Sequence, residues 1–438
     1  MRTSWLILMM LVSTSTLADD WPHWRGPNFN GSSDETGLAT HWSRTEGLAW
    51  TAILPGPSAA TPVVHGRYLF VSSTDPDNGQ LLALCFDAVT GHLKWEKEVS
   101  VGEVRRDNGS NFASCSPVTD GKMVVFFYGT GQLVAYGMEG NALWKRDIQE
   151  DYGEFAFLWT YASSPLIHDG RLYLQVLQRD VPVEGRGFED QPNESYLLAL
   201  VPETGESLWK VFRASEAVAE SRESFSSPVV ATVNGITQIL VAGGDDVTGH
   251  DPATGEELWR WGTWNPSRIE HWRFVPSPVA STDVVLVCAP KKSPVYAVKG
   301  GGEGELDDDA LAWTSKDRSV LTSDVPTPAF YGGDFFILSD LRKTLARVEP
   351  TTGEIKWSAP TPGSAKYEAS PTVVDNKVYL INFVGDVVIY DATSGQELNT
   401  ISMAEPADDP IRSTVVAANG RLYIRTNDHL YCVASNAP

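Results

Sequence analysis

Side chains that could bind a ligand or perform chemistry recur at one kind of position, within a few residues of a small residue that is followed by proline. They combine aromatic rings, positively charged groups and carboxylates, which together could bind a polar ligand with a flat face. The alternative is a solvated rim in which these charges pair with one another. The set consists of Trp159, Tyr161, Arg222, Glu223, Trp272, Arg273, Asp324, Lys366, Tyr367, Glu368 and Arg412.

Spacing does not support other kinds of site. The segment DPDNGQ (75–80) resembles part of a calcium loop but lacks the closing glutamate, so it predicts a turn. The acidic stretch GGGEGELDDD (300–309) predicts a solvated insertion. No HExxH, His-x-His, CxxC or GxSxG spacing occurs, so we predict no metal ligand set and assign no catalytic residue. We expect most of the cysteines to be small buried strand residues: Cys85, Cys115, Cys288 and Cys432.

Two short markers recur along the chain and define the elements that must carry these side chains. The first is a glycine turn followed by tryptophan, best preserved in DAVTGHLKW (87–95) and DPATGEELW (251–259). The second is a small residue, a proline and then apolar residues, as in SSPVV (226–230). Its prolines lie 43 to 63 residues apart, at positions 62, 117, 165, 228, 278, 328 and 371. Such a period indicates a repeat architecture.

Between the markers lie short runs rich in β-branched and aromatic residues, such as LYLQV (172–176) and VYLIN (378–382). Four short antiparallel strands per repeat predict an all-β, eight-bladed β-propeller; seven blades is the alternative, because the fifth repeat is irregular. The last repeat, from residue 411, lacks a fourth strand, whereas GLAWTAIL (47–54) has no strands before it. We therefore expect the N-terminal strand to complete the last blade and close the ring.

The AxxTGxxxW spacing resembles the tryptophan-docking signature of the pyrroloquinoline-quinone (PQQ) propeller repeat family, over nearly all of 45–435. The resemblance implies that one tryptophan per repeat packs between adjacent blades, which buries a large apolar ring. These residues are Trp50, Trp95, Trp144, Trp209, Trp259, Trp313 and Trp357. The segment 19–38 resembles the start of secreted bacterial PQQ-like repeat proteins, and we expect Trp21, Trp24 and Arg25 to pin it to the ring.

The resemblance leaves two kinds of function open. The family's quinoprotein dehydrogenases bind PQQ, a planar quinone, with Ca²⁺ at the channel mouth, whereas members such as the assembly factor BamB use the ring as a binding surface. The family's dehydrogenases often carry two adjacent cysteines beside the cofactor, and this sequence has none; it also lacks the haem motif CxxCH. The resemblance therefore favours a non-catalytic binding scaffold in the cell envelope. The alternatives are a PQQ/Ca²⁺-dependent alcohol or sugar dehydrogenase and a glycan-binding or glycan-cleaving propeller.

Composition and the first residues indicate where such a protein acts. The net charge of −22 disfavours binding to nucleic acid or to anionic membranes. Residues 1–18 combine Arg2, a short apolar run and a small-residue cleavage site, which is typical of a secretory signal. We expect an N-terminal arm over 19–44 and one propeller domain over 45–438. The predicted protein is a periplasmic or secreted monomer without a membrane span, and its partner is an envelope protein or a small polar ligand.

Overall fold

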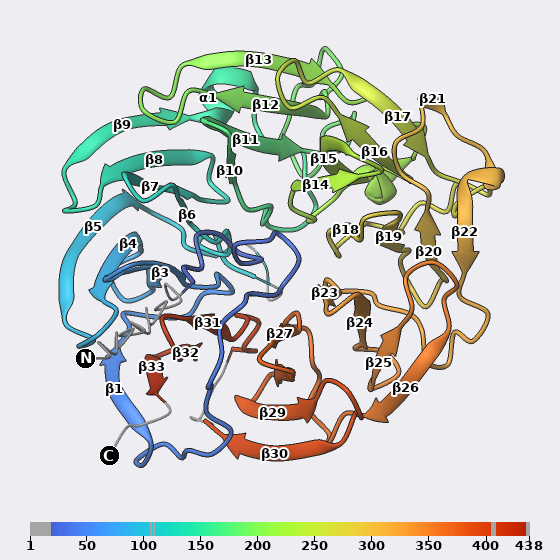
Figure 1. Ribbon diagram of the computed structural model, residues 1–438. Coiled ribbons are helices and arrows are strands. Elements are labelled where there is room, and N and C mark those ends of the chain that lie inside the picture. The colour runs from blue at the N-terminus through green and yellow to red at the C-terminus, as the bar shows by residue number, and fades with distance from the viewer. Residues whose placement is uncertain (1–18, 106, 108–109, 404–408, 435–438) are drawn as a thin grey trace, which may run out of the picture.

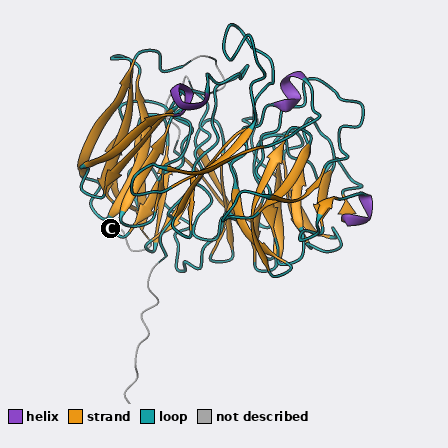
Figure 2. Ribbon diagram, turned by 90° about the horizontal axis from the view of Figure 1, so that it is seen from above, coloured by secondary structure: helices purple, strands orange, loops and turns teal. Residues whose placement is uncertain are grey.

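The chain forms a closed ring of eight β-sheets around a central channel (Figure 1). The computed structural model describes residues 19–105, 107, 110–403 and 409–434. Within these ranges each sheet has four antiparallel strands, and one carries a fifth, short strand. Seen from the side, the strands of neighbouring sheets stand next to one another and the loops gather at the two faces of the ring (Figure 2). The predicted all-β, eight-bladed propeller is confirmed, and the seven-bladed alternative is wrong.

The first four blades each begin with a short strand at the channel and end with a strand at the outer edge. Blade 1 contains β2 (Val63–His65), β3 (Tyr68–Asp75), β4 (Gln80–Asp87) and β5 (Leu93–Val101). Blade 2 contains β6 (Val118–Thr119), β7 (Met123–Phe127), β8 (Gln132–Gly137) and β9 (Ala142–Asp147), followed by helix α1 (Ile148–Tyr152). Blade 3 contains β10 (Leu166–His168), β11 (Arg171–Val176), β12 (Tyr196–Leu200) and β13 (Ser207–Phe212), followed by the 3₁₀ turn η1 (Ala219–Arg222). Blade 4 contains β14 (Val229–Val233), β15 (Ile236–Gly243), β16 (Asp246–His250), β17 (Glu257–Trp261) and the added β21 (Gly304–Glu305).

The remaining blades continue in the same order around the ring. Blade 5 contains β18 (Val279–Ala280), β19 (Val285–Cys288), β20 (Val295–Val298) and β22 (Leu311–Thr314), with the 3₁₀ turn η2 (Asp308–Ala310) before β22. Blade 6 contains β23 (Ala329–Tyr331), β24 (Asp334–Ser339), β25 (Thr344–Val348) and β26 (Ile355–Pro360). Blade 7 contains β27 (Thr372–Val374), β28 (Lys377–Ile381), β29 (Asp386–Asp391) and β30 (Glu397–Ser402). Blade 8 contains β31 (Val416–Ala418), β32 (Arg421–Arg425), β33 (His429–Ala434) and β1 (Leu48–Ile53).

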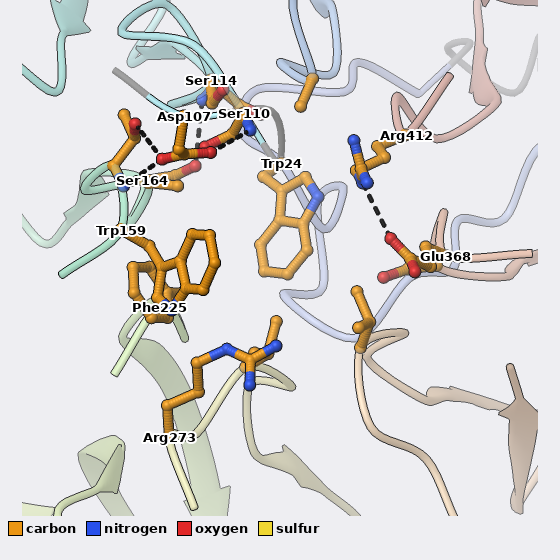
Figure 3. A pocket seen from close by; sticks show the side chains of 17 residues that line it. Trp24, Asp107, Ser110, Ser114, Trp159, Ser164, Phe225, Arg273, Glu368 and Arg412 are labelled. Carbon is orange, nitrogen blue, oxygen red and sulfur yellow. Dashed lines mark hydrogen bonds and ion pairs between the residues drawn. The ribbon is translucent and has the colours of Figure 1, made fainter. Parts of the chain in front are cut away.

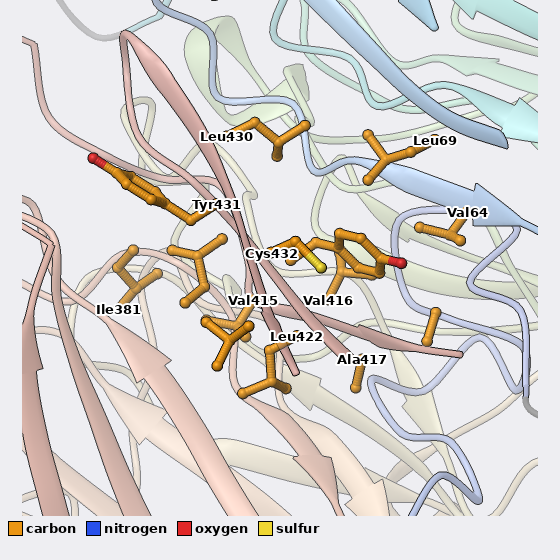
Figure 4. Close-up of a cluster of buried hydrophobic side chains, with 14 of the residues drawn as sticks. Val64, Leu69, Ile381, Val415, Val416, Ala417, Leu422, Leu430, Tyr431 and Cys432 are labelled. Atoms are coloured by element: carbon orange, nitrogen blue, oxygen red, sulfur yellow. The ribbon is translucent and has the colours of Figure 1, made fainter. Parts of the chain in front are cut away.

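The two ends of the chain share blade 8, as the sequence predicts. Strand β1 pairs antiparallel with β33, and Thr51 lies opposite Tyr431. Apolar side chains of blades 7, 8 and 1 form one buried cluster around this junction (Figure 4). In it, Ile381 of blade 7 and Leu69 of blade 1 lie on either side of blade 8 residues such as Leu430. The closure therefore combines strand pairing with a continuous apolar core.

A belt of hydroxyl groups links the blades around the channel. The small residue of each proline marker is serine or threonine, and its hydroxyl accepts the backbone N–H of the matching residue in the preceding blade. The donor and acceptor pairs are Thr61 to Ser116, Ser116 to Ser164, Ser164 to Ser227, Ser227 to Ser277, Ser277 to Thr327 and Thr327 to Ser370, all at 2.8–3.0 Å. Thr414 joins blade 8 to blade 1, because its N–H donates to the Thr61 hydroxyl at 3.1 Å. The sequence predicted a small residue here, but the position requires a hydroxyl group.

Most of the repeat tryptophans lie against the turn glycine of the next blade. An added Cβ at Gly91 would lie 2.5 Å from the Trp50 ring, and one at Gly353 would lie 2.6 Å from the Trp313 ring. The indole N–H groups of Trp50, Trp95, Trp144, Trp313 and Trp357 donate to backbone carbonyls in the same turns, at 2.7–3.1 Å. Trp209 also lies against its glycine, Gly255, but Tyr173 makes the hydrogen bond to that turn, through the Pro252 carbonyl.

Trp259 departs from the arrangement that the resemblance implies. Its indole N–H donates to Gln238 of its own blade at 2.6 Å, and Trp261 packs against Tyr296 of blade 5 instead, with ring centroids 5.1 Å apart. The reason lies in blade 5, which reaches its outer strand through the 300–309 insertion rather than through a glycine turn. Part of this insertion, β21, adds to the outer edge of blade 4 beside Trp259.

Candidate functional site

The N-terminal arm crosses the channel and hydrogen-bonds to the innermost strands or to the loops next to them. Its backbone is bonded to five blades (1, 2, 6, 7 and 8), through the pairs Trp21 with Val64, Pro22 with Thr119, Asn30 with Phe330, Gly31 with Val373, and Asp19 with Asn419. Trp21 is completely buried. The arm therefore closes the channel on one side and leaves a pocket open on the other.

This pocket has a volume of about 390 Å³ and lies at the mouth of the channel (Figure 3). All eight connections that lead into the innermost strands contribute to its wall, and Trp24 of the arm lies at its centre. The residues lining it are Trp24, Ala59, Asp107, Ser110, Ser114, Ser116, Trp159, Thr160, Ala162, Ser164, Phe225, Arg273, Val275, Val325, Glu368, Ser370 and Arg412.

Four of the side chains predicted to rim the channel line this pocket: Trp159, Arg273, Glu368 and Arg412. Trp159 is 40% exposed and its indole N–H donates to Glu220 at 3.1 Å. Arg273 has the same carboxylate as its ion-pair partner, at the longer distance of 3.7 Å. Arg412 is held more firmly, since it donates to Glu368 at 2.8 Å and lies over the Phe383 ring.

The other predicted rim residues do not line the pocket. Tyr161 and Tyr367 are buried, and their hydroxyls donate to the carbonyls of Gln175 and Pro362. Their expected place at the rim was wrong because, in both cases, the ring turns into the sheet core rather than toward the channel. Trp272 packs in the same way against the core between blades 4 and 5.

The remaining charged residues of the predicted rim are engaged in ion pairs outside the pocket lining. Arg222 pairs with Asp180, Asp324 with Lys291, and the exposed Lys366 lies 3.7 Å from Glu368. Glu223 is completely buried and accepts hydrogen bonds from the Leu158 N–H and the Arg179 guanidinium. Burial raises the pKa of Glu223 to about 7, although these two hydrogen bonds by themselves would lower it. These residues therefore match the alternative prediction from the sequence, in which the charged groups pair with one another instead of binding a ligand.

Sequence reasoning missed the residues that shape the pocket most. Trp24 was expected to fasten the arm, with a carbohydrate or partner contact of the arm as the alternative. Asp107 precedes its proline marker by ten positions; it accepts hydrogen bonds from the N–H and hydroxyl of Thr160 and from the Ser110 N–H. Phe225 was not among the predicted rim residues. Spacing to the marker could have suggested Phe225, but nothing local to Trp24 reveals that it reaches the channel.

A buried positive charge lies beneath the floor. The Arg25 guanidinium is 5.6 Å from the centre of the Trp24 ring and donates to the carbonyls of Pro328 and Pro371. Among the described residues no carboxylate pairs with it. Burial lowers the pKa of Arg25 to about 9, which leaves the group charged at neutral pH.

The residues at the mouth do not fit a calcium-bound quinone. A calcium ion needs six to eight oxygen ligands, several of them carboxylates. Among the described residues, the pocket lining holds only two carboxylates, Asp107 and Glu368, and they lie on opposite sides of it (Figure 3). No group of three His, Cys, Asp or Glu side chains in the described chain could hold a metal ion.

The four cysteines are buried and unpaired, and burial raises the pKa of each thiol.

Comparison with known proteins identifies the family. A family model described as "Outer membrane protein assembly factor BamB" matches residues 32–181 and 193–436. The chain belongs to the BamB family. Among curated proteins, none matches the sequence.

Solved structures similar to this BamB-family chain include both kinds of propeller. BamB from Moraxella catarrhalis is 12% identical with a TM-score of 0.56, over 88% of this chain and 96% of that one. Quinohemoprotein alcohol dehydrogenase from Comamonas testosteroni is 13% identical with a TM-score of 0.66, over 96% and 81%. A europium-containing methanol dehydrogenase is 11% identical with a TM-score of 0.63, over 94% and 90%. At these identities the likeness establishes the fold alone.

The described part of this BamB-family chain contains no helix that is long and apolar enough to cross a membrane. The secretory signal expected at 1–18 lies outside the described residues.

Proposed function

We propose that this protein is an exported, non-catalytic binding propeller, in which the channel mouth holds a polar ligand or a side chain of a partner protein. The observation that carries the proposal is the pocket itself: eight inter-blade connections and the arm converge on one cavity that combines aromatic faces with charged groups. Concave sites of this size, with few polar groups on an apolar lining, are typical of specific binding. Membership of the BamB family agrees with a binding role.

Its place of action follows from the same proposal. We infer that residues 1–18 are removed on export and that the mature chain acts in the periplasm or outside the cell, as a monomer. An envelope protein or a small polar solute is then the accessible partner.

The competing function is a PQQ/Ca²⁺-dependent alcohol or sugar dehydrogenase, favoured by the fold shared with quinoprotein dehydrogenases. It requires the purified chain to bind PQQ in a Ca²⁺-dependent way and to reduce a dye with alcohols or aldoses. Dye reduction by the reconstituted protein would overturn the binding proposal.

A photo-crosslinking experiment tests the binding role directly. A photoreactive phenylalanine replaces Trp159, which is exposed in the mouth, in the full chain; the matched control replaces Phe212, which is 58% exposed on the outer strand of blade 3. After incubation with envelope extract and irradiation, we expect an adduct from position 159 and none from position 212. Equal labelling at the two positions would contradict a specific site at the mouth.

A further inference from the structure

Hydrogen-bond donors face the pocket from the hydroxyl belt. Ser116, Ser164 and Ser370 line the cavity, each is less than one-tenth exposed, and each uses an oxygen lone pair to accept an N–H from the preceding blade. None of the three hydroxyls donates to another described residue. A hydroxyl has one hydrogen to donate, and a buried one that is left unpaired costs free energy. These three donors therefore point to a ligand rich in oxygen acceptors.

Positive charge in the same cavity favours an anionic group on that ligand. Arg273 and Arg412 reach the pocket from different sides (Figure 3). Arg25, 5.6 Å from the centre of the Trp24 ring, has no carboxylate partner among the described residues. The lining balances these two guanidinium groups against the carboxylates of Asp107 and Glu368, and the buried Arg25 adds one positive charge in a chain whose net charge is −22. Arg273 is the freer of the two lining arginines, because its ion pair is 3.7 Å long against 2.8 Å for Arg412.

The pocket also offers acceptors and flat apolar faces. The carboxylates of Asp107 and Glu368 can accept hydrogen bonds from ligand hydroxyls, and they would repel a ligand that is anionic over its whole surface. Trp24, Trp159 and Phe225 provide aromatic surfaces against which a ring can stack. A ligand that satisfies all these groups has a ring, several hydroxyls and one carboxylate.

We propose that the mouth binds a sugar acid, with the pyranose ring on Trp24, the carboxylate at Arg273, and the ring hydroxyls at the belt serines, Asp107 and Glu368. This inference rests on the proposed binding function of the same pocket and names its ligand class. The sugar acid can be a free hexuronate or a uronate unit of an acidic polysaccharide. The volume of about 390 Å³ accommodates one such unit, and the open mouth leaves room for a chain to continue into solvent.

Titration calorimetry on the purified mature chain tests the ligand class. The probes are D-galacturonate, its neutral counterpart D-galactose, and tri-galacturonate, which separates a free acid from a polysaccharide unit. We expect D-galacturonate to bind at least tenfold more tightly than D-galactose; tri-galacturonate binding as tightly as the monomer, or more tightly, assigns the site to polysaccharide. Equal affinity for galacturonate and galactose, or no heat with either acid, would overturn the proposal.

Variants separate the site from the fold. Arg273→Gln is expected to reduce the preference for galacturonate over galactose to less than threefold, and Trp24→Leu to weaken both sugars at least tenfold. Arg67→Gln, which removes an exposed arginine that pairs with Asp87 and does not line the pocket, is the matched control and is expected to bind like the parent. Thermal melts of each variant show whether it is folded. A folded Arg273→Gln that keeps the full preference would contradict the assignment of the carboxylate.

The two proposals fail differently. If galacturonate does not bind but the probe at position 159 still forms its specific adduct, the sugar acid is excluded and the binding function stands. If neither occurs, both are overturned.

Discussion

Among single residues, a turn glycine can be required for two reasons: its backbone has a positive φ, or a tryptophan ring lies where a Cβ would be. Gly395 has a φ of +74°, and an added Cβ would lie 2.6 Å from the Trp357 ring. Gly420 has a φ of +67° but no atom within 4 Å of an added Cβ. We expect Gly420→Ala to cost about 1 kcal/mol through backbone strain alone. Gly395→Ala should cost an additional ~1–3 kcal/mol, because the indole must move. Urea unfolding of both variants measures the two changes in unfolding free energy. Equal losses would show that the contact with Trp357 does not add to the cost of the substitution.

A buried histidine gives the stability of the ring a dependence on pH. His250 is 1% exposed and its two ring nitrogens contact the Gly255 carbonyl and the Thr248 hydroxyl. Burial lowers its pKa from the ordinary 6.5 to about 4. Between these values the unfolded chain binds a proton that the folded chain does not. The depressed pKa of His250 therefore costs no stability above pH 6.5. As the pH falls from 6.5 toward 4, the protein's free energy of unfolding decreases by up to about 1.4 kcal/mol per pH unit.

His250→Gln removes this titration, so its melting temperature should fall less between pH 7 and pH 4 than that of the parent. Substitution of the exposed His271 by glutamine is the control and should leave the parent's pH profile unchanged. Parallel profiles for the parent and His250→Gln would show that the histidine is protonated without cost in the folded state.

Between elements, the hydroxyl belt is the connection that repeats most regularly. The Ser227 hydroxyl accepts the Ser164 N–H at 2.8 Å in a fully packed environment. Ser227→Ala leaves that N–H buried without an acceptor, which should cost about 1–3 kcal/mol. Ser413 occupies the equivalent place in blade 8, but its buried hydroxyl has no hydrogen-bond partner among the residues that the structure describes. Ser413→Ala should therefore be neutral or slightly stabilising. Chemical denaturation of Ser227→Ala and Ser413→Ala measures the two changes in unfolding free energy. Similar losses of stability in both variants would mean that the hydroxyl belt stabilises the ring only through packing.

The repeats could be predicted at the level of elements because each is encoded locally. In most units a glycine turn, a tryptophan four residues later and a proline before the innermost strand recur in the same order, so their spacing indicates the strand order. The same reasoning stopped at the interfaces between units. Tyr161 and Tyr367 were predicted at the rim, whereas both rings pack into the core. Trp259 was treated like the other tryptophans, although the partner turn in blade 5 is missing.

The candidate site was predictable only in part, because its floor comes from a distant segment. Arg273, Glu368, Trp159 and Arg412 could be found from their distance to the proline markers. Trp24 is brought to them by backbone pairing of the arm with inner strands of blades on both sides of the channel. No pattern near residue 24 encodes those contacts, which depend on the closed ring.

For the whole molecule, closure depends on one strand pair that joins the two ends of the chain. Elsewhere an outer strand is connected to its blade by a turn or, in blade 5, by the 300–309 insertion, but β1 is connected to β33 only through the entire ring. Opening this pair would expose the edge of blade 8, whereas the arm, which carries Trp24, would keep its own hydrogen bonds to five blades.

A disulfide across the closure should stabilise the protein more than one within a blade. Ile53 and His429 are directly opposite on β1 and β33, and Ile53 is largely exposed; their replacement by cysteines closes a loop that spans nearly the whole propeller. Gln80 and Val101, opposite on β4 and β5, offer the matched control within blade 1. Because the entropy removed from the unfolded chain grows with the logarithm of loop length, the closure disulfide should add roughly 2–3 kcal/mol more than the control. Thermal melts of both proteins, oxidised and reduced, measure the difference. If the control gained as much, the loop-length argument for the closure disulfide would be contradicted.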